Sequence, residues 1–171
     1  MKEIILNDNN LHDNDISEIV IRVKGLLINS DNKLLLAFNN NTYQFPGGHL
    51  EKGEEIVDCL IREIKEETGI NITITEEPFL VIKTYDNNYF GSGKKVLNII
   101  YYFRVFCDEL PNFSETHYDE LEQASEFNLY YVPFNDLGNF LKNGMNDGML
   151  DLSIGREMLN VLSVYNDVYG G

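Results

Sequence analysis

The chain has 171 residues and is strongly acidic, with 28 Asp and Glu residues against 13 Lys and Arg residues and a formal net charge of −15. Its length is typical of a single domain, and a hydrophobic content of 43% is enough to build a core. An acidic surface repels the phosphate backbone, so no nucleic acid polymer is expected as a partner. No apolar run approaches the roughly 20 residues of a membrane-spanning helix, so no membrane partner is expected either.

The first residues lack the basic and apolar regions of a secretion signal. The two cysteines, Cys59 and Cys107, fit neither a metal-binding spacing nor a disulfide framework. Two reduced thiols are typical of a protein in the cytoplasm, which is the location that we expect.

Hydrophobic periodicity and turn residues predict the elements. Residues 1–15 are polar, rich in Asn and Asp, and are expected to form a loose arm ahead of a single domain over residues 16–171. In chain order the expected elements are a β-hairpin over 17–38, a helix over 54–68, strands over 71–84, 95–106 and 126–132, a short helix over 133–141 and a C-terminal helix over 153–165. This order predicts an α/β protein with a mixed sheet between helices.

The negative charge is concentrated in two segments, 48–70 with a net charge of −4 and 108–126 with a net charge of −7. The first contains the clearest helix, with an apolar stripe at every fourth residue and a glycine stop at Gly69. Glu63, Glu66 and Glu67 are neighbours on this helix at spacings i, i+3 and i+4. Three carboxylates on one rigid helix are suited to Mg²⁺ or Mn²⁺, and a solvated acidic face is an equally good interpretation of the pattern.

The residues before this helix favour the metal interpretation. Gly47 and Gly48 would allow the backbone to approach a cation or a phosphate closely. Residues 48–70 then read Gly, five residues, Glu, seven residues, and Arg-Glu-Ile-Lys-Glu-Glu-Thr-Gly-Ile. This segment resembles the signature of the Nudix hydrolase family at all nine defined positions.

The resemblance implies an α/β/α sandwich and a metal-dependent hydrolase, a pyrophosphohydrolase that cleaves the pyrophosphate bond between a nucleoside and another moiety. The expected cofactor is Mg²⁺ or Mn²⁺, and the expected partner is a small nucleotide-type phosphate ester. Nucleoside triphosphates and their modified deoxy forms, dinucleoside polyphosphates and nucleotide sugars all remain open as substrates. A homodimer is compatible with the sequence.

The resemblance also implies roles for individual residues. Glu66 and Glu67 correspond to the core metal ligands of the family, and Glu63 is either a further ligand or the base that deprotonates water. The carbonyl of Gly47 is a candidate backbone ligand. Arg62 is expected to orient a glutamate, and Glu54 to brace the loop against the helix through Arg62.

Other candidates lie outside the signature or at its variable positions. Glu120 and Glu122, just before the strand at 126–132, are candidates for an additional carboxylate. Tyr85, Tyr89 and His49 are candidates for contacts with the substrate. The alternative is a solvated surface position for Glu120, Glu122 and His49, which the sequence favours for each alone, and a core position for the two tyrosines.

Two other functions are alternatives to hydrolysis. The first is a non-catalytic regulatory module that binds a nucleotide on the same fold, although such modules usually have a degraded signature. The second is an isomerase of isoprenoids on the same fold, which needs a cysteine near the site. Cys59 is expected to face the core and Cys107 lies at the end of a strand, so this reading ranks last.

Overall fold

The structure, a computed structural model, describes residues 1–39, 42–118 and 127–170. The strands are β1 (Lys2–Leu6), β2 (Glu18–Ile28), β3 (Lys33–Asn39), β4 (Thr42–Gln44), β5 (Leu80–Asp86), β6 (Val96–Phe106) and β7 (Asn128–Pro133). The α-helices are α1 (Ile56–Thr68), α3 (Leu137–Asn146) and α4 (Leu152–Tyr169), and the 3₁₀ helices are η1 (Asp13–Asp15), η2 (Tyr89–Gly91) and η3 (Phe134–Asp136).

The strands form one mixed, seven-stranded sheet in the order β1-β5-β6-β2-β3-β4, with β7 paired to β3. The longest pairing is the parallel one between β2 and β6, whose register runs from Glu18↔Val96 to Ile28↔Phe106. β5 is antiparallel to β6, and β1 is parallel to β5. The two long strands β2 and β6 are therefore the central pair of the sheet.

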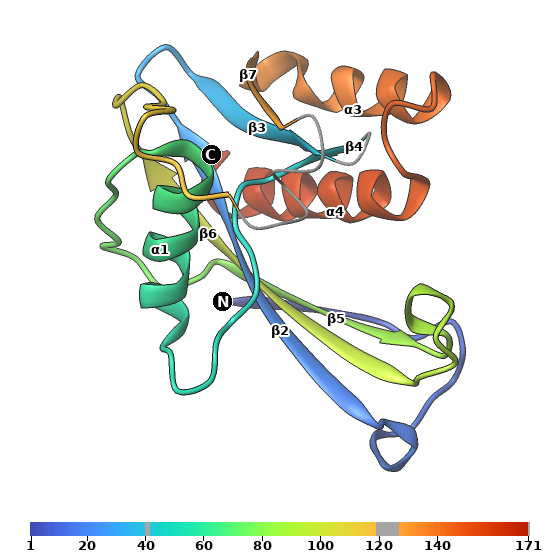
Figure 1. Ribbon diagram of the computed structural model, residues 1–171. Helices are drawn as coiled ribbons and strands as arrows, with labels where there is room; N and C mark the ends of the chain where they lie inside the picture. Colours follow the sequence, from blue (N-terminus) through green and yellow to red (C-terminus); the bar gives the residue numbers. More distant parts are fainter. Residues whose placement is uncertain (40–41, 119–126, 171) are drawn as a thin grey trace.

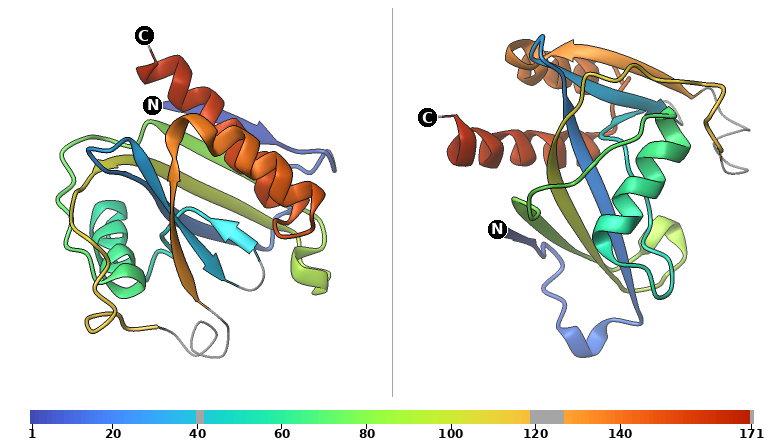
Figure 2. Two further views of the ribbon diagram at one scale, coloured as in Figure 1. Left: turned by 90° about the horizontal axis from the view of Figure 1, so that it is seen from above. Right: turned by 90° about the vertical axis from the view of Figure 1, so that its left-hand side faces the viewer.

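Helices cover both faces of this sheet (Figure 1). Successive residues of β2 point to opposite faces: Val23 packs in the core beneath α1, and Leu26 packs in the core beneath α3 and α4. The two further views show the same layers, with α1 on one side and α3 and α4 on the other (Figure 2). The expected α/β/α sandwich with a mixed sheet between helices is therefore confirmed.

The N-terminal arm differs from the expectation in one part. Residues 2–6 of the expected loose arm form β1, which pairs with β5 from Lys2↔Leu80 to Leu6↔Thr84. Ile4 and Leu6 pack against the core on the α4 side. This strand of five residues is stabilised by pairing with β5, which lies far along the chain, so no local sequence pattern predicts it.

The expected β-hairpin over 17–38 is present at its turn, but its strands diverge. β2 and β3 share only the pair Ile28↔Leu34, and the main partners are β6 for β2 and β7 for β3. The expected strand over 71–84 begins only at Leu80. The segment before Leu80 is apolar because it helps to fill the core: Ile72 is buried beneath α1 although it does not belong to a strand.

The bounds of α1 and α4 are close to those predicted, whereas those of the short helix expected over 133–141 differ. Pro133 ends β7, η3 follows it, and α3 begins only at Leu137 and continues to Asn146. α1 begins at Ile56, two residues later than expected, because the backbone at Glu54 is still in the preceding turn and donates to the Glu51 carbonyl. It ends as predicted at Gly69, whose φ of 71° is in the left-handed region. The C-terminal helix α4 is longer than predicted and ends at Tyr169. No helix in the described ranges is both long and apolar enough to cross a bilayer.

Candidate functional site

The apolar stripe of α1 decides where its glutamates lie. Leu60 and Ile64 are completely buried against the sheet, and burying a side chain of this size contributes about 1.5–3 kcal/mol. Because this face is fixed, the neighbouring face of the helix carries the three glutamates. Glu63 and Glu67 contact the loop that precedes the helix, at Gly48 and Gly47. Their exposure differs: Glu67 is 4% exposed, whereas the side chains of Glu63 and Glu66 are 15% and 37% exposed.

Arg62 is the hub of this group. Its Nε and Nη2 donate to the two carboxylate oxygens of Glu54 over 2.8 and 3.0 Å. Its Nη1 donates to Glu63 over 2.9 Å and to Glu66 over 3.0 Å. A guanidinium is the side chain best suited to such a fork of bonds. The predicted contact between Glu54 and Arg62 is therefore present, and Arg62 also orients two of the three candidate ligands.

The same contacts shift the pKa of both partners. The hydrogen bonds from Arg62 lower the pKa of Glu54 from 4.5 to about 2. The carboxylate of Glu54 in turn raises the pKa of Arg62. Both groups are therefore charged at neutral pH, where this ion pair links the loop to the helix.

The glycine loop is held against both the sheet and the helix. The carbonyl of Gly48 accepts from Val23 N over 3.0 Å. The N–H of Gly47 donates to Glu67 Oε2 over 2.8 Å, which holds that buried carboxylate in place. A Cβ at Gly47 would lie 2.2 Å from Val23 O, and one at Gly48 would lie 2.2 Å from Glu63 Oε2. The two glycines thus let the backbone pass between the sheet and the carboxylates.

The chemistry of these donors fits a divalent cation. Carboxylate oxygens are the ligands that Mg²⁺ and Mn²⁺ prefer, and the carboxylate of Glu63 lies directly against the backbone at Gly48. The glutamates are nevertheless not gathered into a cage: no three His, Cys, Asp or Glu side chains of the described residues are arranged around one point. Arg62 holds Glu63 and Glu66 instead, while Glu67 is turned toward Gly47.

Two of the three predicted substrate contacts meet at a residue that sequence reasoning missed. Arg22 on β2 donates through Nε to His49 Nε2 over 2.9 Å and through Nη2 to Tyr89 Oη over 2.8 Å. Tyr85 lies elsewhere, since its hydroxyl donates to Asp13 over 2.7 Å. The structure therefore brings His49 and Tyr89 together and leaves Tyr85 apart from them.

A second missed residue, Lys24, is two positions along β2 and therefore on the same face of the sheet. Its ammonium donates to Gln44 Oε1 and to the carbonyl of Phe45, each over 3.1 Å. Lys24 is only 8% exposed. Burial lowers its pKa, and the negative charges of Glu157 and Glu67 oppose this effect. Lys24 thus lies between the α1 glutamates and the face covered by α4.

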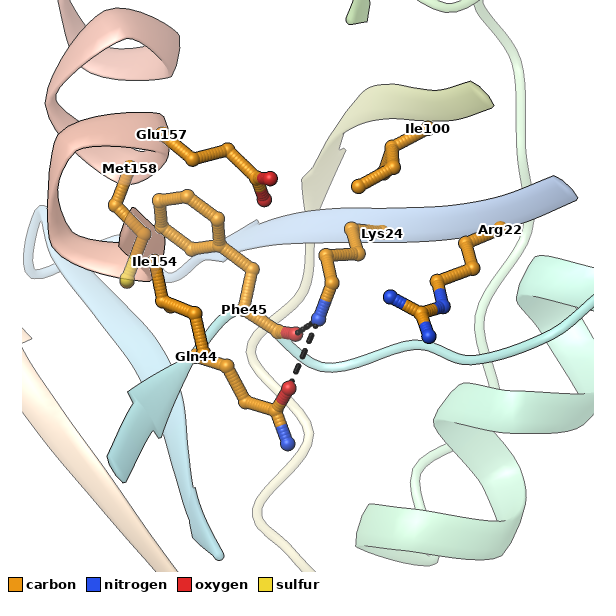
Figure 3. A pocket seen from close by; sticks show the side chains of 8 residues that line it. All are labelled: Arg22, Lys24, Gln44, Phe45, Ile100, Ile154, Glu157 and Met158. Carbon is orange, nitrogen blue, oxygen red and sulfur yellow. Dashed lines mark hydrogen bonds between the residues drawn. The ribbon is translucent and has the colours of Figure 1, made fainter. Parts of the chain in front are cut away.

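Lys24 and Arg22 line a small pocket of about 80 Å³ beneath α4 (Figure 3). The remaining lining residues of this pocket are Gln44, Phe45, Ile100, Ile154, Glu157 and Met158. The pocket shares four of its residues with a cleft of about 920 Å³ that runs along the sheet to η2. Tyr89 and Phe90 line the far part of this cleft. A space large enough for a nucleotide therefore adjoins this small pocket.

Residues 112–117, in the first half of the second acidic segment, lie over the C-terminal end of α1. Asn112 N donates to the carbonyl of Thr68, and His117 N donates to the carbonyl of Glu66, each over 2.9 Å. Glu120 and Glu122, the candidates for an additional carboxylate, lie outside the described residues. Their role stays a prediction.

Comparison with known proteins decides the family. A family model described as the NUDIX domain matches residues 19–151, which is well over half of the chain. The chain belongs to the Nudix family.

Individual Nudix relatives are distant. The chain is 31% identical over 112 residues to an ADP-ribose pyrophosphatase of Methanocaldococcus jannaschii, covering 63% of this chain and 61% of the relative. It is 29% identical over 110 residues to an NAD-capped RNA hydrolase of Vibrio atlanticus, covering 62% of this chain and 36% of the relative. The chain therefore spans less than two thirds of the length of either relative.

A solved structure of a MutT protein from Methanosarcina mazei is similar in fold, with a TM-score of 0.56 and 18% identity. It covers 87% of this chain, and the chain covers 96% of it. At this level of identity the similarity concerns the fold alone.

The Nudix match also separates the missed residues into two groups. Arg22, Lys24 and Gln44 lie within the matched segment. Arg22 and Lys24 interrupt an otherwise apolar strand at alternate positions, a signal in the sequence that would have placed both on one face. Glu157 lies on α4, beyond the matched segment, and only the packing of α4 across the sheet brings it to the pocket.

Proposed function

We propose that this chain is a metal-dependent hydrolase that cleaves the pyrophosphate bond between a nucleoside and another moiety. One observation carries the proposal: within the Nudix segment, Arg62 and the glycine loop hold Glu63, Glu66 and Glu67 at one end of α1. The activities named for the two relatives, on ADP-ribose and on NAD-capped RNA, belong to the same type of pyrophosphate cleavage.

The reaction is a substitution at phosphorus. The oxygen of water forms the new P–O bond, the bridging oxygen leaves with the electron pair of the broken bond, and a carboxylate accepts a proton from the water. Glu63 is the candidate for this base, and the hydrogen bond from Arg62 Nη1 would orient its carboxylate. A bound divalent cation, Mg²⁺ or Mn²⁺, supplies the positive charge that a pyrophosphate needs at an acidic site.

The residues around the glutamates would bind and orient the substrate. Glu67, Glu66 and Glu63 would hold the cation, with a backbone carbonyl of the glycine loop as a further ligand. Arg22 and Lys24 add two positive charges on the cleft face of β2, where a phosphate chain could lie between the cleft and α1. His49 and Tyr89 would keep the guanidinium of Arg22 in position.

The experiment is to measure phosphate release from a panel of nucleotides with Mg²⁺ for the wild type, Glu66→Gln and Glu67→Gln. We expect each substitution to lower kcat by 10²-fold or more, because each removes a negative charge from the cation site. Glu77→Gln is the matched control, since Glu77 is an exposed glutamate before β5. Thermal unfolding of all four proteins tests whether they are folded. Full activity in both α1 variants would contradict the assignment.

The second candidate is a regulatory module that binds a nucleotide without cleaving it. The observation in its favour is that the described carboxylates are engaged with Arg62 and Gly47 and are not gathered around one point. Calorimetry with the same nucleotides separates the two functions. Binding without turnover of any panel member supports the module, and Mg²⁺-dependent turnover excludes it.

A small nucleotide is the substrate that we favour over a capped RNA, because a net charge of −15 repels a long polyanion. A cytoplasmic location fits the two free thiols, Cys59 and Cys107. The environment of Cys59 also disfavours the isomerase: burial raises the pKa of its thiol to about 12, which leaves it unreactive.

A further inference from the structure

The strand β1 forms one margin of the sheet, and its outer edge is open. Within the described ranges, β1 pairs with β5 on one side and with no strand on the other (Figure 2). The N–H of Lys2 donates to the carbonyl of Phe79 over 2.8 Å. In a parallel pair such bonds recur at every second residue, so the backbone groups of Glu3 and Ile5 face away from β5. Among the described residues, none forms a hydrogen bond to these outward groups.

The outer edge of β1 lacks most of the features that normally protect an open edge. Proteins protect such edges with proline, with a bulge, with very short strands or with several charged side chains. At the other end of the strand order, β4 has only three residues. β1 has five residues, contains no proline and keeps one register with β5 along its whole length. The side chain of Ile5 is 57% exposed. This edge is therefore suited to accept a further strand.

The charge at this margin is unlike that of the chain as a whole. The net charge of −15 makes two copies of the chain repel one another. The paired residues 2–6 and 80–84 contain only three charged side chains, Lys2, Glu3 and Lys83. Two bases and one acid give this margin a net charge of +1, and Lys83 Nζ lies 2.6 Å from Glu3 Oε2. A second copy can therefore approach at β1 without strong local repulsion.

We propose that β1 pairs in an antiparallel arrangement with β1 of a second copy of this chain, so that two sheets join across a two-fold axis. A second copy always supplies an open strand of equal length. In an antiparallel pair, outward backbone groups must face outward backbone groups. With Ile4 on the axis, Glu3 lies opposite Ile5 of the partner subunit and exchanges two hydrogen bonds with it. The symmetry forms the same pair a second time.

This register is the one that the residues of β1 favour. With the axis at Glu3, this side chain would lie opposite Glu3 of the partner subunit, and like charges directly opposite one another are destabilising. With the axis at Ile5, Glu3 would lie opposite Asn7 of the partner subunit, which is beyond the end of the strand. Only with the axis at Ile4 do both outward residues of each strand pair within the strands and without opposing like charges.

The experiment is sedimentation equilibrium of the protein, without nucleotide or metal, over a series of concentrations. Two short strands bury little surface, so we expect a reversible dimer with a Kd on the order of micromolar. Ile5→Glu places a carboxylate opposite Glu3 at two symmetric positions and should raise this Kd by about 10-fold or more. Ile5→Lys places an ammonium there and should leave the Kd unchanged or lower it.

Ile19 provides matched controls for both variants. Its side chain is 59% exposed, close to the value for Ile5, but it lies on β2, which is separated from β1 by β5 and β6. Ile19→Glu and Ile19→Lys change the net charge exactly as the two Ile5 variants do. We expect both to leave the Kd of the dimer within about twofold of the wild-type value, because β2 lies outside the paired edge. Thermal unfolding of each variant tests whether it is folded.

Amide exchange measured by NMR tests the proposal on the wild type alone. The N–H groups of Glu3 and Ile5 should exchange rapidly at low protein concentration and slowly at high concentration. The N–H of Ile4 faces β5 and should be protected at every concentration. Protection of Glu3 and Ile5 that does not depend on concentration would contradict pairing between copies.

A wild type that stays monomeric throughout the series would overturn the proposal. The same holds if Ile5→Glu and Ile5→Lys weaken the dimer equally, or if Ile19→Glu weakens it as much as Ile5→Glu does. None of these results bears on hydrolysis, because β1 lies outside the segment that matches the family and the assay contains no nucleotide.

Discussion

Arg62 shows how one side chain can organise a whole site. It holds Glu54 with two hydrogen bonds and Glu63 and Glu66 with one each. Two of these contacts are to glutamates that would also bind the cation. The positive charge of the guanidinium offsets part of the repulsion between these negatively charged carboxylates, so they can stay close together.

The pair of Glu54 and Arg62 makes stability depend on pH in a defined direction. The pKa of Glu54 in the folded protein is about 2, below its ordinary value of 4.5. A carboxylate with a depressed pKa contributes stability that is complete above pH 4.5 and is lost as the pH falls through about 2. Glu54→Gln should therefore be less stable than the wild type at pH 7, and the difference should shrink below pH 4.5.

Urea unfolding of both proteins at several pH values between 7 and 3 measures this difference directly. Comparison with the variant cancels the effects of the other acidic groups. A difference in the free energy of unfolding that stays constant over the whole range would show that Glu54 does not titrate with a depressed pKa.

At the scale of elements, α1 ends at Gly69, a position that requires glycine for two separate reasons. Gly69 has a φ of 71°, which favours glycine, and a Cβ there would lie 2.0 Å from the carbonyl oxygen of Asn112. Gly93, in the loop after η2, has a φ of 74° and no atom within 4 Å of such a Cβ. The two glycines thus share the backbone conformation but differ in crowding.

Alanine substitutions should separate these effects. Gly93→Ala should lower the free energy of unfolding by about 1–2 kcal/mol, the cost of a left-handed residue with a Cβ. Gly69→Ala should lower it by more, because the segment that contains Asn112 must also move away from α1. Chemical denaturation measures both values, and equal losses would show that the contact with Asn112 yields without cost.

On the scale of the whole molecule, the high negative charge makes the stability of the fold sensitive to the proposed divalent cation. With a net charge of −15 and an α1 carrying clustered glutamates, the folded chain should bind divalent cations more tightly than the unfolded chain does. A ligand that binds only the folded state stabilises it, by about 2.7 kcal/mol at 100 times its Kd.

Mg²⁺ should therefore raise the Tm of the wild type by more than KCl does at the same ionic strength. The double variant Glu66→Gln and Glu67→Gln should lose most of this difference while keeping the response to KCl. If Mg²⁺ shifted the Tm of both proteins equally, the cation would be acting on the general charge and not on α1.

The features that the sequence determines by itself are local. The apolar stripe and the glycine stop of α1 depend on residues within one or two turns, so the helix and its end at Gly69 are predicted correctly. The same short range includes the whole Nudix signature, from Gly48 to Ile70, and the pairing of Glu54 with Arg62. The layered fold follows from the order of such elements.

Only the tertiary structure decides what depends on residues far apart in the chain. β1 exists because the edge of β5 pairs with it, and β2 and β3 diverge because β6 and β7 are their main partners. Arg22 meets Tyr89 across 67 positions, and Glu157 meets Tyr102 across 55. Periodicity in a sequence records which face of an element is apolar, but not which other element covers it. The glutamates of α1 could therefore be found from the sequence, whereas the pocket beneath α4 required the packing of that helix on the sheet.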